Sequence, residues 1–292
     1  MAFQIKRRSV ARQLGKLVRK QLDLAIVNLD NGAVSNAGIH DARTHIKKAR
    51  SIVKLLKEAL DDKYGAGNNT LQSAGQSLAQ VRDLEAMVET VAELGRRYPD
   101  VISQAVAQQI VAGLHSHPDD DSLHVNKVAH EAAAMLGRAR NTLPNHIEEA
   151  GDFFYVRAGM AAVYQRSQAA LQDLTDASDS ASFHKWRKRV KEHWYHVRLF
   201  EALHPAAQAR AASLKVLEQE LGDGHNLSLL SATLLKDRRH FGDPSSIDRV
   251  LEIIQKRQQP LRTSALARGR DLFAAKPRTI AATADEWRRG KR

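Results

Sequence analysis

The chain has 292 residues, 43% of them hydrophobic and 27% charged, a composition typical of globular rather than disordered proteins. It contains no cysteine, which excludes disulfides and thiolate metal sites, and no stretch approaches the roughly 18 consecutive apolar residues of a membrane-spanning helix. The formal net charge of +12 predicts an anionic partner, and the lack of a long apolar stretch leads us to expect no membrane partner. We expect a cytoplasmic protein, because charges interrupt the N-terminal segment where a signal peptide would be apolar.

Helical periodicity runs through nearly the whole chain, and no alternating strand pattern interrupts it. We therefore predict an all-α protein. The expected helices span residues 8–30, 38–60, 68–95, 99–114, 122–141, 146–174, 180–203, 206–221, 224–240, 245–272 and 276–289. The expected breaks fall at residues 65–69, at Tyr98-Pro99, at residues 118–121, at Pro144, at His204-Pro205 and at residues 242–244.

Cations lie directly beside an apolar seam in the expected helix 38–60. The seam recurs every three or four residues, as in a helix with one buried face. Its members are Ile39, Ala42, Ile46, Ala49, Val53, Leu56 and Leu60. A second row follows one residue later, about 100° around the helix, and we call it the first ridge. Its members are His40, Arg43, Lys47, Arg50, Lys54 and Lys57. The preceding helix offers a similar row in Arg8, Arg12, Lys16 and Arg19.

Charge is segregated along the chain. Residues 1–57 hold 13 Lys or Arg against 3 Asp or Glu, whereas residues 58–152 hold 7 against 15. Within this acidic part, Arg82 and Asp83 are most simply an ion pair, although Arg82 is also a candidate ligand contact. His115, His117 and residues 119–121 have metal-ligand side chains, but they lie in a proline-containing loop without a helical partner. We expect no metal site there.

The segment near residue 184 repeats the segment near residue 40. At an offset of 144 residues, His184, Arg187 and Lys191 match members of the first ridge. The second ridge consists of these three residues and Arg198, with Lys188 alongside. Trp194 occupies the position that corresponds to Arg50, so one cation is missing. A looser echo relates residues 78–84 to residues 221–227, where His225-Asn226 replaces Arg82-Asp83. The repeat divides the chain into halves of approximately 1–145 and 146–292.

Rows of like charge are unfavourable on an isolated helix, because cations three or four residues apart repel. A polyanion would relieve that repulsion. Each ridge places roughly one cation per turn of about 5.4 Å, which suits a linear chain of phosphates. Arginine supplies forked donors to phosphate oxygens and lysine a mobile charge, while a histidine beside a polyanion can gain a proton. A solvated helix face is the alternative interpretation, but duplication of the same spacing argues against it.

The two ridges resemble the motif of the CHAD family, named for a histidine in an α-helical domain. The resemblance is supported by residues 78–83 and 265–273 and covers essentially the whole chain as one domain. It implies two four-helix bundles related by a pseudo-two-fold axis, with a central basic groove or pore that binds inorganic polyphosphate. The ligand contacts it implies are His40, Arg43, Lys47, Arg50, His184, Arg187 and Lys191. Helical geometry extends this set to Lys54, Lys57, Lys188, Arg198, Arg12 and Arg19.

Binding without catalysis and without a cofactor is the function that the sequence favours. No P-loop, dinucleotide fingerprint, zinc-protease motif or serine-hydrolase motif is present. One alternative is a protein that binds nucleic acid nonspecifically through the same phosphate contacts, although aromatic residues are not interleaved with the cations. Another is an enzyme that makes or degrades polyphosphate. The sequence leaves open whether the protein associates with polyphosphate granules.

Overall fold

The computed structural model describes residues 3–5, 10–30, 34–116, 122–150 and 152–290, without the side chains of residues 80–82 and 122–123. These residues form α-helices and no strand, as expected. In chain order the helices are α1 (Val10–Leu29), α2 (Asn36–Leu55), α3 (Lys57–Leu60), α4 (Asp62–Ser77), α5 (Ala79–Arg97), α6 (Gln104–His115), α7 (Ser122–Ala150), α8 (Phe153–Gln172), α9 (Ser180–Arg198), α10 (Pro205–Lys236), α11 (Arg238–Phe241), α12 (Pro244–Leu272) and α13 (Pro277–Arg289). Within the described ranges, no helix is long and apolar enough to cross a membrane.

Side-chain caps fix where the two ridge helices begin. Ser35 accepts a hydrogen bond from the backbone N–H of Gly38 at the start of α2. Asp179 does the same for Ser182 at the start of α9. Such caps satisfy backbone donors that have no partner within the helix. They set the register in which each ridge faces its surroundings.

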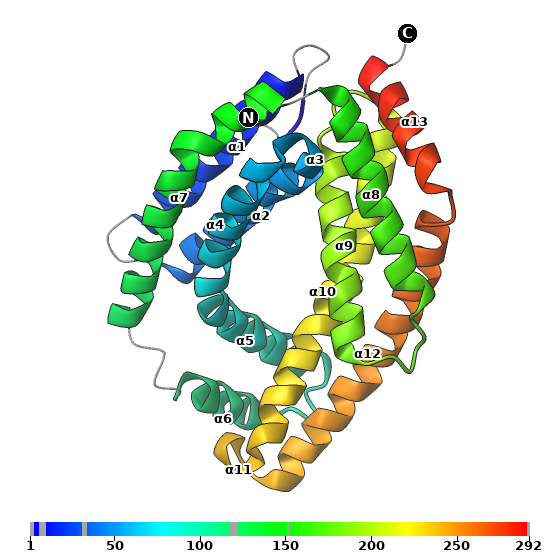
Figure 1. The fold of residues 1–292 in the computed structure, drawn as a ribbon. Coiled ribbons are helices and arrows are strands. Elements are labelled where there is room, and N and C mark those ends of the chain that lie inside the picture. The colour runs from blue at the N-terminus through cyan, green and yellow to red at the C-terminus, as the bar shows by residue number, and fades with distance from the viewer. Residues whose placement is uncertain (1–2, 6–9, 31–33, 117–121, 151, 291–292) are drawn as a thin grey trace.

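Two groups of long helices stand side by side (Figure 1). In the first, α1 packs on α2 and α7, and α4 packs on the same two helices. In the second, α9 packs on α8 and α10, while α12 and α13 lie against α10 and α8. Helix α2 touches both α8 and α9, and one apolar core extends from Phe3 to Trp287 through both groups. The two ridge helices therefore lie where the groups meet.

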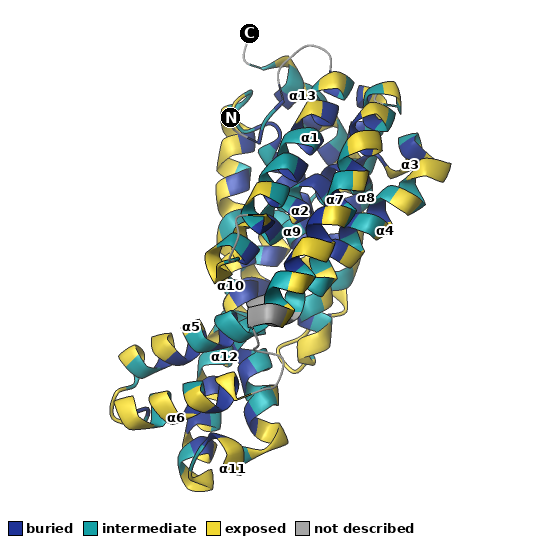
Figure 2. Cartoon of the chain, turned by 90° about the vertical axis from the view of Figure 1, so that its left-hand side faces the viewer, coloured by how far each residue is buried: buried dark blue, intermediate teal, exposed yellow. Residues whose placement is uncertain are grey.

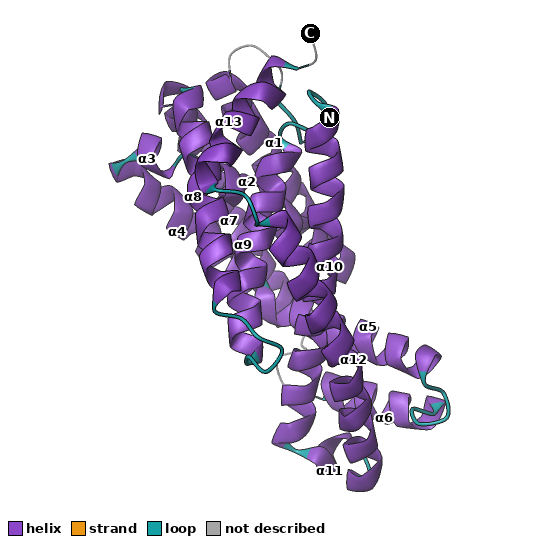
Figure 3. Ribbon diagram, turned by 90° about the vertical axis from the view of Figure 1, so that its right-hand side faces the viewer, coloured by secondary structure: helices purple, strands orange, loops and turns teal. Residues whose placement is uncertain are grey.

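A third part of the molecule has a core of its own. Figures 2 and 3 show a lobe, built from α5, α6, α11 and the adjoining ends of α10 and α12, that projects beyond the long helices. Its buried residues are Met87, Val91, Leu94, Ile102, Ile110, Leu114, Leu227, Leu230, Leu234, Phe241, Ile247, Val250 and Ile254. The lobe mixes segments from both sequence halves. The two groups of long helices, by contrast, each come from one part of the chain, α1 to α7 and α8 to α13, and the expected boundary near residue 145 lies close to the end of α7 at Ala150.

Glycine permits the closest approach between the two groups. A Cβ atom at Gly159 of α8 would lie 2.0 Å from the carbonyl oxygen of Leu55, far inside van der Waals contact. At Gly67 of α4, a Cβ would lie 2.7 Å from a methyl group of Leu143 on α7. Gly67 belongs to the segment 65–69 that we expected to be a break. The sequence prediction was wrong there, because this glycine serves helix packing and not a turn.

Other predicted boundaries also needed correction. The expected helix 38–60 breaks at Leu56 into α2 and α3, and the expected helix 68–95 breaks at Leu78 into α4 and α5. Conversely, α10 runs unbroken through residues 222–224. Pro144 lies within α7 and does not end it. Local propensity is a weak preference of at most about 1 kcal/mol per residue except at proline, so it predicts helix boundaries poorly.

Candidate anion-binding site

The predicted seam of α2 is buried and the ridge beside it is not. Ile39, Ala42, Ile46, Ala49 and Val53 are at most 2% exposed. Along the first ridge, His40 and Lys47 are exposed, and Arg43, Arg50 and Lys54 are half-buried. Because the ridge lies about 100° from the seam, it reaches the edge of the first helix group and faces the second.

Helix α9 presents its ridge in the same way. The seam residues Phe183, Trp186, Val190 and Val197 are at most 8% exposed. Arg187 and Lys191 are half-buried, with side chains 20% and 21% exposed. The ridge position between Lys191 and Arg198 belongs to Trp194, which leaves a gap in the row of charges.

The two ridges converge. Lys191 and Arg187 of α9 are both close enough to Lys47 of α2 to lower its pKa. Two further contacts join the same helices: the Lys54 ammonium lies 2.9 Å from the Glu192 carboxylate, and the imidazole of His196 hydrogen-bonds the carbonyl of Ser51 at 2.9 Å. The two ridges therefore face each other and do not point outward on opposite sides of the molecule.

The convergence of the two ridges changes the pKa of Lys47 strongly. The surrounding protein and then the cations Lys191, Arg43 and Arg187 lower its pKa from 10.5 to about 7, against a smaller opposing effect of Glu218. Its side chain nevertheless remains accessible to solvent. We conclude that Lys47 lies at a solvent-exposed position between α2 and α9, where the electrostatic potential is positive.

One buried carboxylate holds the second ridge together. Glu218 of α10 is 4% exposed and lies 2.6 Å from Lys191, 3.4 Å from Arg187 and 3.6 Å from Lys215. Burial alone would raise its pKa, but these cations lower it below its ordinary value, so it stays ionised. The sequence analysis missed Glu218. The sequence feature that could have identified it is a carboxylate on the apolar face of the expected helix, between Leu214 and Leu221.

A second buried carboxylate, Glu192 of α9, plays the same part nearer the end of α2. It is 6% exposed, and in addition to Lys54 it lies 3.6 Å from Arg189 and 3.7 Å from Arg166. Its pKa is also lowered by these neighbours, despite burial. Each glutamate therefore faces three cations and neutralises only one charge. The site keeps a positive excess.

Neutral oxygens orient the arginines of the first ridge. Arg43 donates to the carbonyl oxygen of Gly75 at 2.7 Å, and Arg50 donates to Asn68 at 3.0 Å and also to Gln72. All three acceptors lie on α4. These bonds fix the guanidinium groups without cancelling their charge, and a fixed guanidinium loses less entropy when it binds an oxyanion.

The histidine of the second ridge stacks on a second imidazole. The rings of His184 and His225, from α9 and α10, are 4.0 Å apart and 29° from parallel. Burial and then nearby cations, including Lys188 and Arg187, lower the pKa of His184 to about 4. Burial and the same surroundings lower the pKa of His225 to about 3. Both rings are neutral near pH 7, so lysine and arginine supply the charge of the unliganded site.

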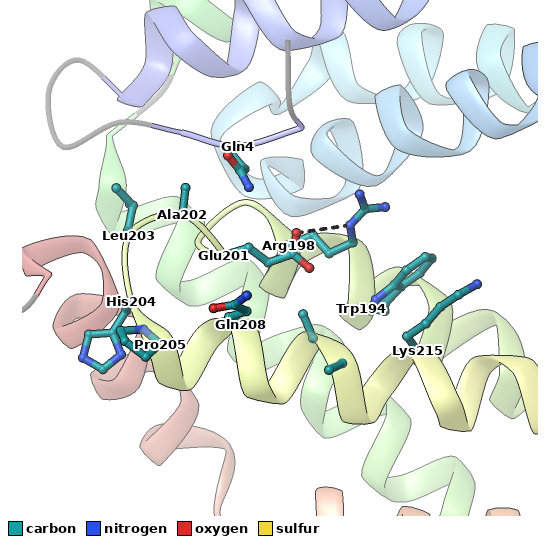
Figure 4. Close-up of a pocket in the computed structure, with 12 residues that line it drawn as sticks. Gln4, Trp194, Arg198, Glu201, Ala202, Leu203, His204, Pro205, Gln208 and Lys215 are labelled. Atoms are coloured by element: carbon teal, nitrogen blue, oxygen red, sulfur yellow. Dashed lines mark ion pairs between the residues drawn. The ribbon is translucent and has the colours of Figure 1, made fainter.

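Trp194 supports cations at the place where the second ridge lacks one. The guanidinium carbon of Arg198 and the ammonium of Lys215 each lie 4.9 Å from the centre of the indole ring. Such cation–π contacts hold a charge in position without neutralising it. Lys215 of α10 thereby replaces the charge that Trp194 removes from α9 (Figure 4).

Comparison with known proteins agrees with this geometry. The family model described as "CHAD domain" matches residues 16–235. The chain belongs to the CHAD family. The crystal structure of the CHAD domain from the plant Ricinus communis is similar to it, with a TM-score of 0.66 at 17% identity over 94% of this chain and 95% of that one. At that identity, the likeness shows a shared fold. No curated protein matches the sequence significantly.

Several predicted contacts lie away from the CHAD ridges. The break at Leu56 puts Lys57 on α3, where its ammonium lies 5.9 Å from the ring centre of Tyr64 on α4. Arg19 of α1 donates to Asn145 of α7 at 3.1 Å, and α1 and α7 form the outer side of the first group (Figure 1). Arg12 is exposed on the same helix. The α1 row thus stands apart from the convergence of α2 and α9.

The remaining predictions concern the ends of the CHAD ridges and the metal loop. His40 is exposed in the first turns of α2, and Lys188 is exposed next to the stacked histidines. The side chain of Arg82 and the residues 117–121 lie outside the described part of the chain, as does Arg8. Among the residues that are described, no group of three or more His, Asp or Glu side chains could hold a metal ion.

Proposed function

We propose that this CHAD-family protein binds inorganic polyphosphate, without turning it over, between the ridges of α2 and α9. The observation that carries the proposal is the gathering of Lys47, Arg43, Arg187 and Lys191, from two helix groups, around a solvent-accessible surface. Such a gathering is costly in the unliganded protein, as the lowered pKa of Lys47 indicates. A bound polyanion would offset that cost.

The shape of the site favours a linear ligand. The cations of α2 follow one another about once per helical turn, and a second row faces them from α9. Two buried nitrogen atoms in the second ridge, Nδ1 of His184 and Nε of Arg187, have no hydrogen-bond partner among the described residues. Buried polar atoms are rarely left unpaired, and a phosphate oxygen between the ridges would accept a hydrogen bond from Arg187 and from the tautomer of His184 that carries its proton on Nδ1.

Binding without turnover is supported by the state of the two carboxylates. Glu218 and Glu192 are held ionised by the cations around them. Neither is therefore available to protonate a departing phosphate near pH 7. Their contribution is to hold the cations of α9, α10 and α2 in place.

The decisive experiment is to measure binding of long-chain polyphosphate by titration calorimetry with charge-reversal variants. We expect Lys47→Glu to weaken binding at least tenfold, and Arg43→Glu combined with Lys47→Glu to abolish it with the fold intact. The control is Lys63→Glu, which makes the same charge change at an exposed residue of α4 paired with Glu149 at 3.5 Å. An equal loss in the control and in Lys47→Glu would place binding elsewhere.

Two further measurements separate this function from its competitors. Labelled RNA or DNA should be displaced by polyphosphate at matched phosphate and salt concentration, whereas preferential binding of nucleic acid would favour a nucleic-acid-binding protein. Incubation of the pure protein with polyphosphate and Mg²⁺ or Mn²⁺ should leave chain length unchanged. Shortening of the chain would identify an enzyme.

A further inference from the structure

A groove of about 820 Å³ lies between the end of α9, the turn that follows it and the start of α10 (Figure 4). Its size falls within the range of small-molecule sites, about 300 to 1,000 Å³. Because α9 and α10 run antiparallel, the C-terminal end of α9 lies beside the N-terminal end of α10, and both ends line the groove. Trp194 and Lys215 mark one end of the groove, and His204 and Gln208 mark the other.

The two ends of the groove differ in chemistry. At the first end, Arg198 and Lys215 flank Trp194. Lys215 also lies 3.6 Å from Glu218, and the Arg198 guanidinium lies 3.6 Å from the carboxylate of Glu201, which can accept hydrogen bonds from hydroxyl groups (Figure 4). This end therefore continues the cationic surface of the two ridges. From Lys215 to His204, α10 covers eleven residues, or about 16 Å of helix.

The second end is suited to an organic group and not to a bare phosphate chain. Its walls include the apolar side chains of Leu203 and Pro205. Its polar groups are the amides of Gln208 and Gln4 (Figure 4). Amides bind the polar edge of a heterocycle, which a bare phosphate chain does not offer.

We propose that this groove binds a nucleoside polyphosphate. Its phosphates lie on Arg198 and Lys215, its sugar hydroxyls lie within reach of Glu201 beside Arg198, and its base lies against the apolar wall near Gln208. The groove shares Arg198 with the end of the second ridge, but Lys47 is not part of its lining. Neither proposal depends on the other, and each has its own diagnostic residue.

Tryptophan fluorescence offers a direct readout of the groove. Trp186 and Trp287 are 0% and 1% exposed, whereas Trp194 is partly exposed beside the two cations. ATP should therefore change the emission of Trp194 on binding, and Trp194→Phe should remove that change. Tripolyphosphate carries the same three phosphates without the nucleoside. We expect ATP to bind at least tenfold more tightly than tripolyphosphate.

Variants test the location. Ala212→Trp adds bulk at an exposed position of α10 and should weaken ATP binding at least tenfold while long-chain polyphosphate binding stays unchanged. Lys47→Gln should have the reverse effect. Equal affinity for ATP and tripolyphosphate would overturn the proposal and make the groove a mere extension of the phosphate site. ATP binding that is insensitive to Ala212→Trp would overturn it as well.

Discussion

At the scale of single residues, Lys47 links the structure of the site to its chemistry. A lysine with a pKa of about 7 carries only part of a charge at neutral pH. The cause lies in the surrounding protein and in the cations Lys191, Arg43 and Arg187, with Glu218 opposing them. A polyanion reverses the sign of the local potential and moves the pKa of Lys47 back toward 10.5.

This coupling predicts that polyphosphate affinity falls as pH rises from 7 to 9. In that range the complex holds a proton on Lys47 that the free protein has lost, so binding takes up protons, and affinity drops by up to about tenfold per pH unit. Below pH 6 Lys47 is charged in both states and its contribution to the pH dependence disappears. Calorimetry in buffers of different ionisation enthalpy measures the proton uptake.

The matched variant is Lys47→Arg, which stays charged throughout this range and should flatten the pH dependence. Any titration of the ligand itself is common to both proteins and cancels in the comparison. His184 and His225 titrate near pH 4 and 3 in the free protein, below the range tested. An unchanged pH profile in Lys47→Arg would contradict the assignment to Lys47.

At the scale of helices, the contact between α8 and the end of α2 decides how closely the two groups approach. The site needs that approach, since Lys54 must reach Glu192 and Lys47 must face Lys191. Gly159 allows it, because any side chain there would meet the backbone carbonyl of Leu55 at 2.0 Å. A backbone atom cannot rotate away as a side chain would.

We therefore expect Gly159→Ala to destabilise the protein by about 1–3 kcal/mol, the usual cost of overpacking, and to weaken polyphosphate binding by separating α2 from α9. Denaturant unfolding and calorimetry measure the two effects. The matched control is Gly137→Ala in α7, where no atom lies within 4 Å of the added Cβ. It should stabilise the protein by about 0.5–1 kcal/mol, as alanine does in a helix interior. Equal free energies of unfolding for Gly159→Ala and Gly137→Ala would contradict a close contact between α8 and the carbonyl of Leu55.

The same scale shows what could be predicted from sequence. The seam and ridge of α2 and the all-α fold followed from periodicity and local chemistry. Helix continuity did not, because Gly67 and Pro144 look like breaks until their packing partners are known. The hydrogen-bond and ion-pair partners of Arg43, Arg50 and Lys191 could not be predicted either. They lie on α4 and at Glu218, which are far from the ridges in sequence and approach them only in the folded protein.

At the scale of the whole molecule, the site joins two helix groups while the lobe of α5, α6 and α11 stands apart with its own core. A polyanion bound as proposed would relieve the repulsion between α2 and α9 and so stabilise the structure that holds them together. The lobe gains no such contact. The molecule should therefore respond unevenly to its ligand.

Hydrogen exchange tests this expectation. Saturating polyphosphate should increase the protection of amides in α2 and α9, by up to about 2.7 kcal/mol at a free ligand concentration one hundred times Kd. Amides of α6 and α11 should keep their exchange rates. A uniform increase across the lobe and the long helices would mean that the molecule opens only as one cooperative unit.

The composition of the lobe core also has a consequence for how the protein is made. Met87 to Leu114 supply one side of that core, and Leu227 to Ile254 supply the other. Leu114 and Ile254 are 140 residues apart, so on a ribosome that adds about 5–20 residues per second the first side waits roughly 7 to 28 s for the second to be complete. During that interval its apolar side chains lack their native partners on α10 and α12, and we expect chaperones that shield hydrophobic segments to bind the nascent chain until synthesis has passed residue 254.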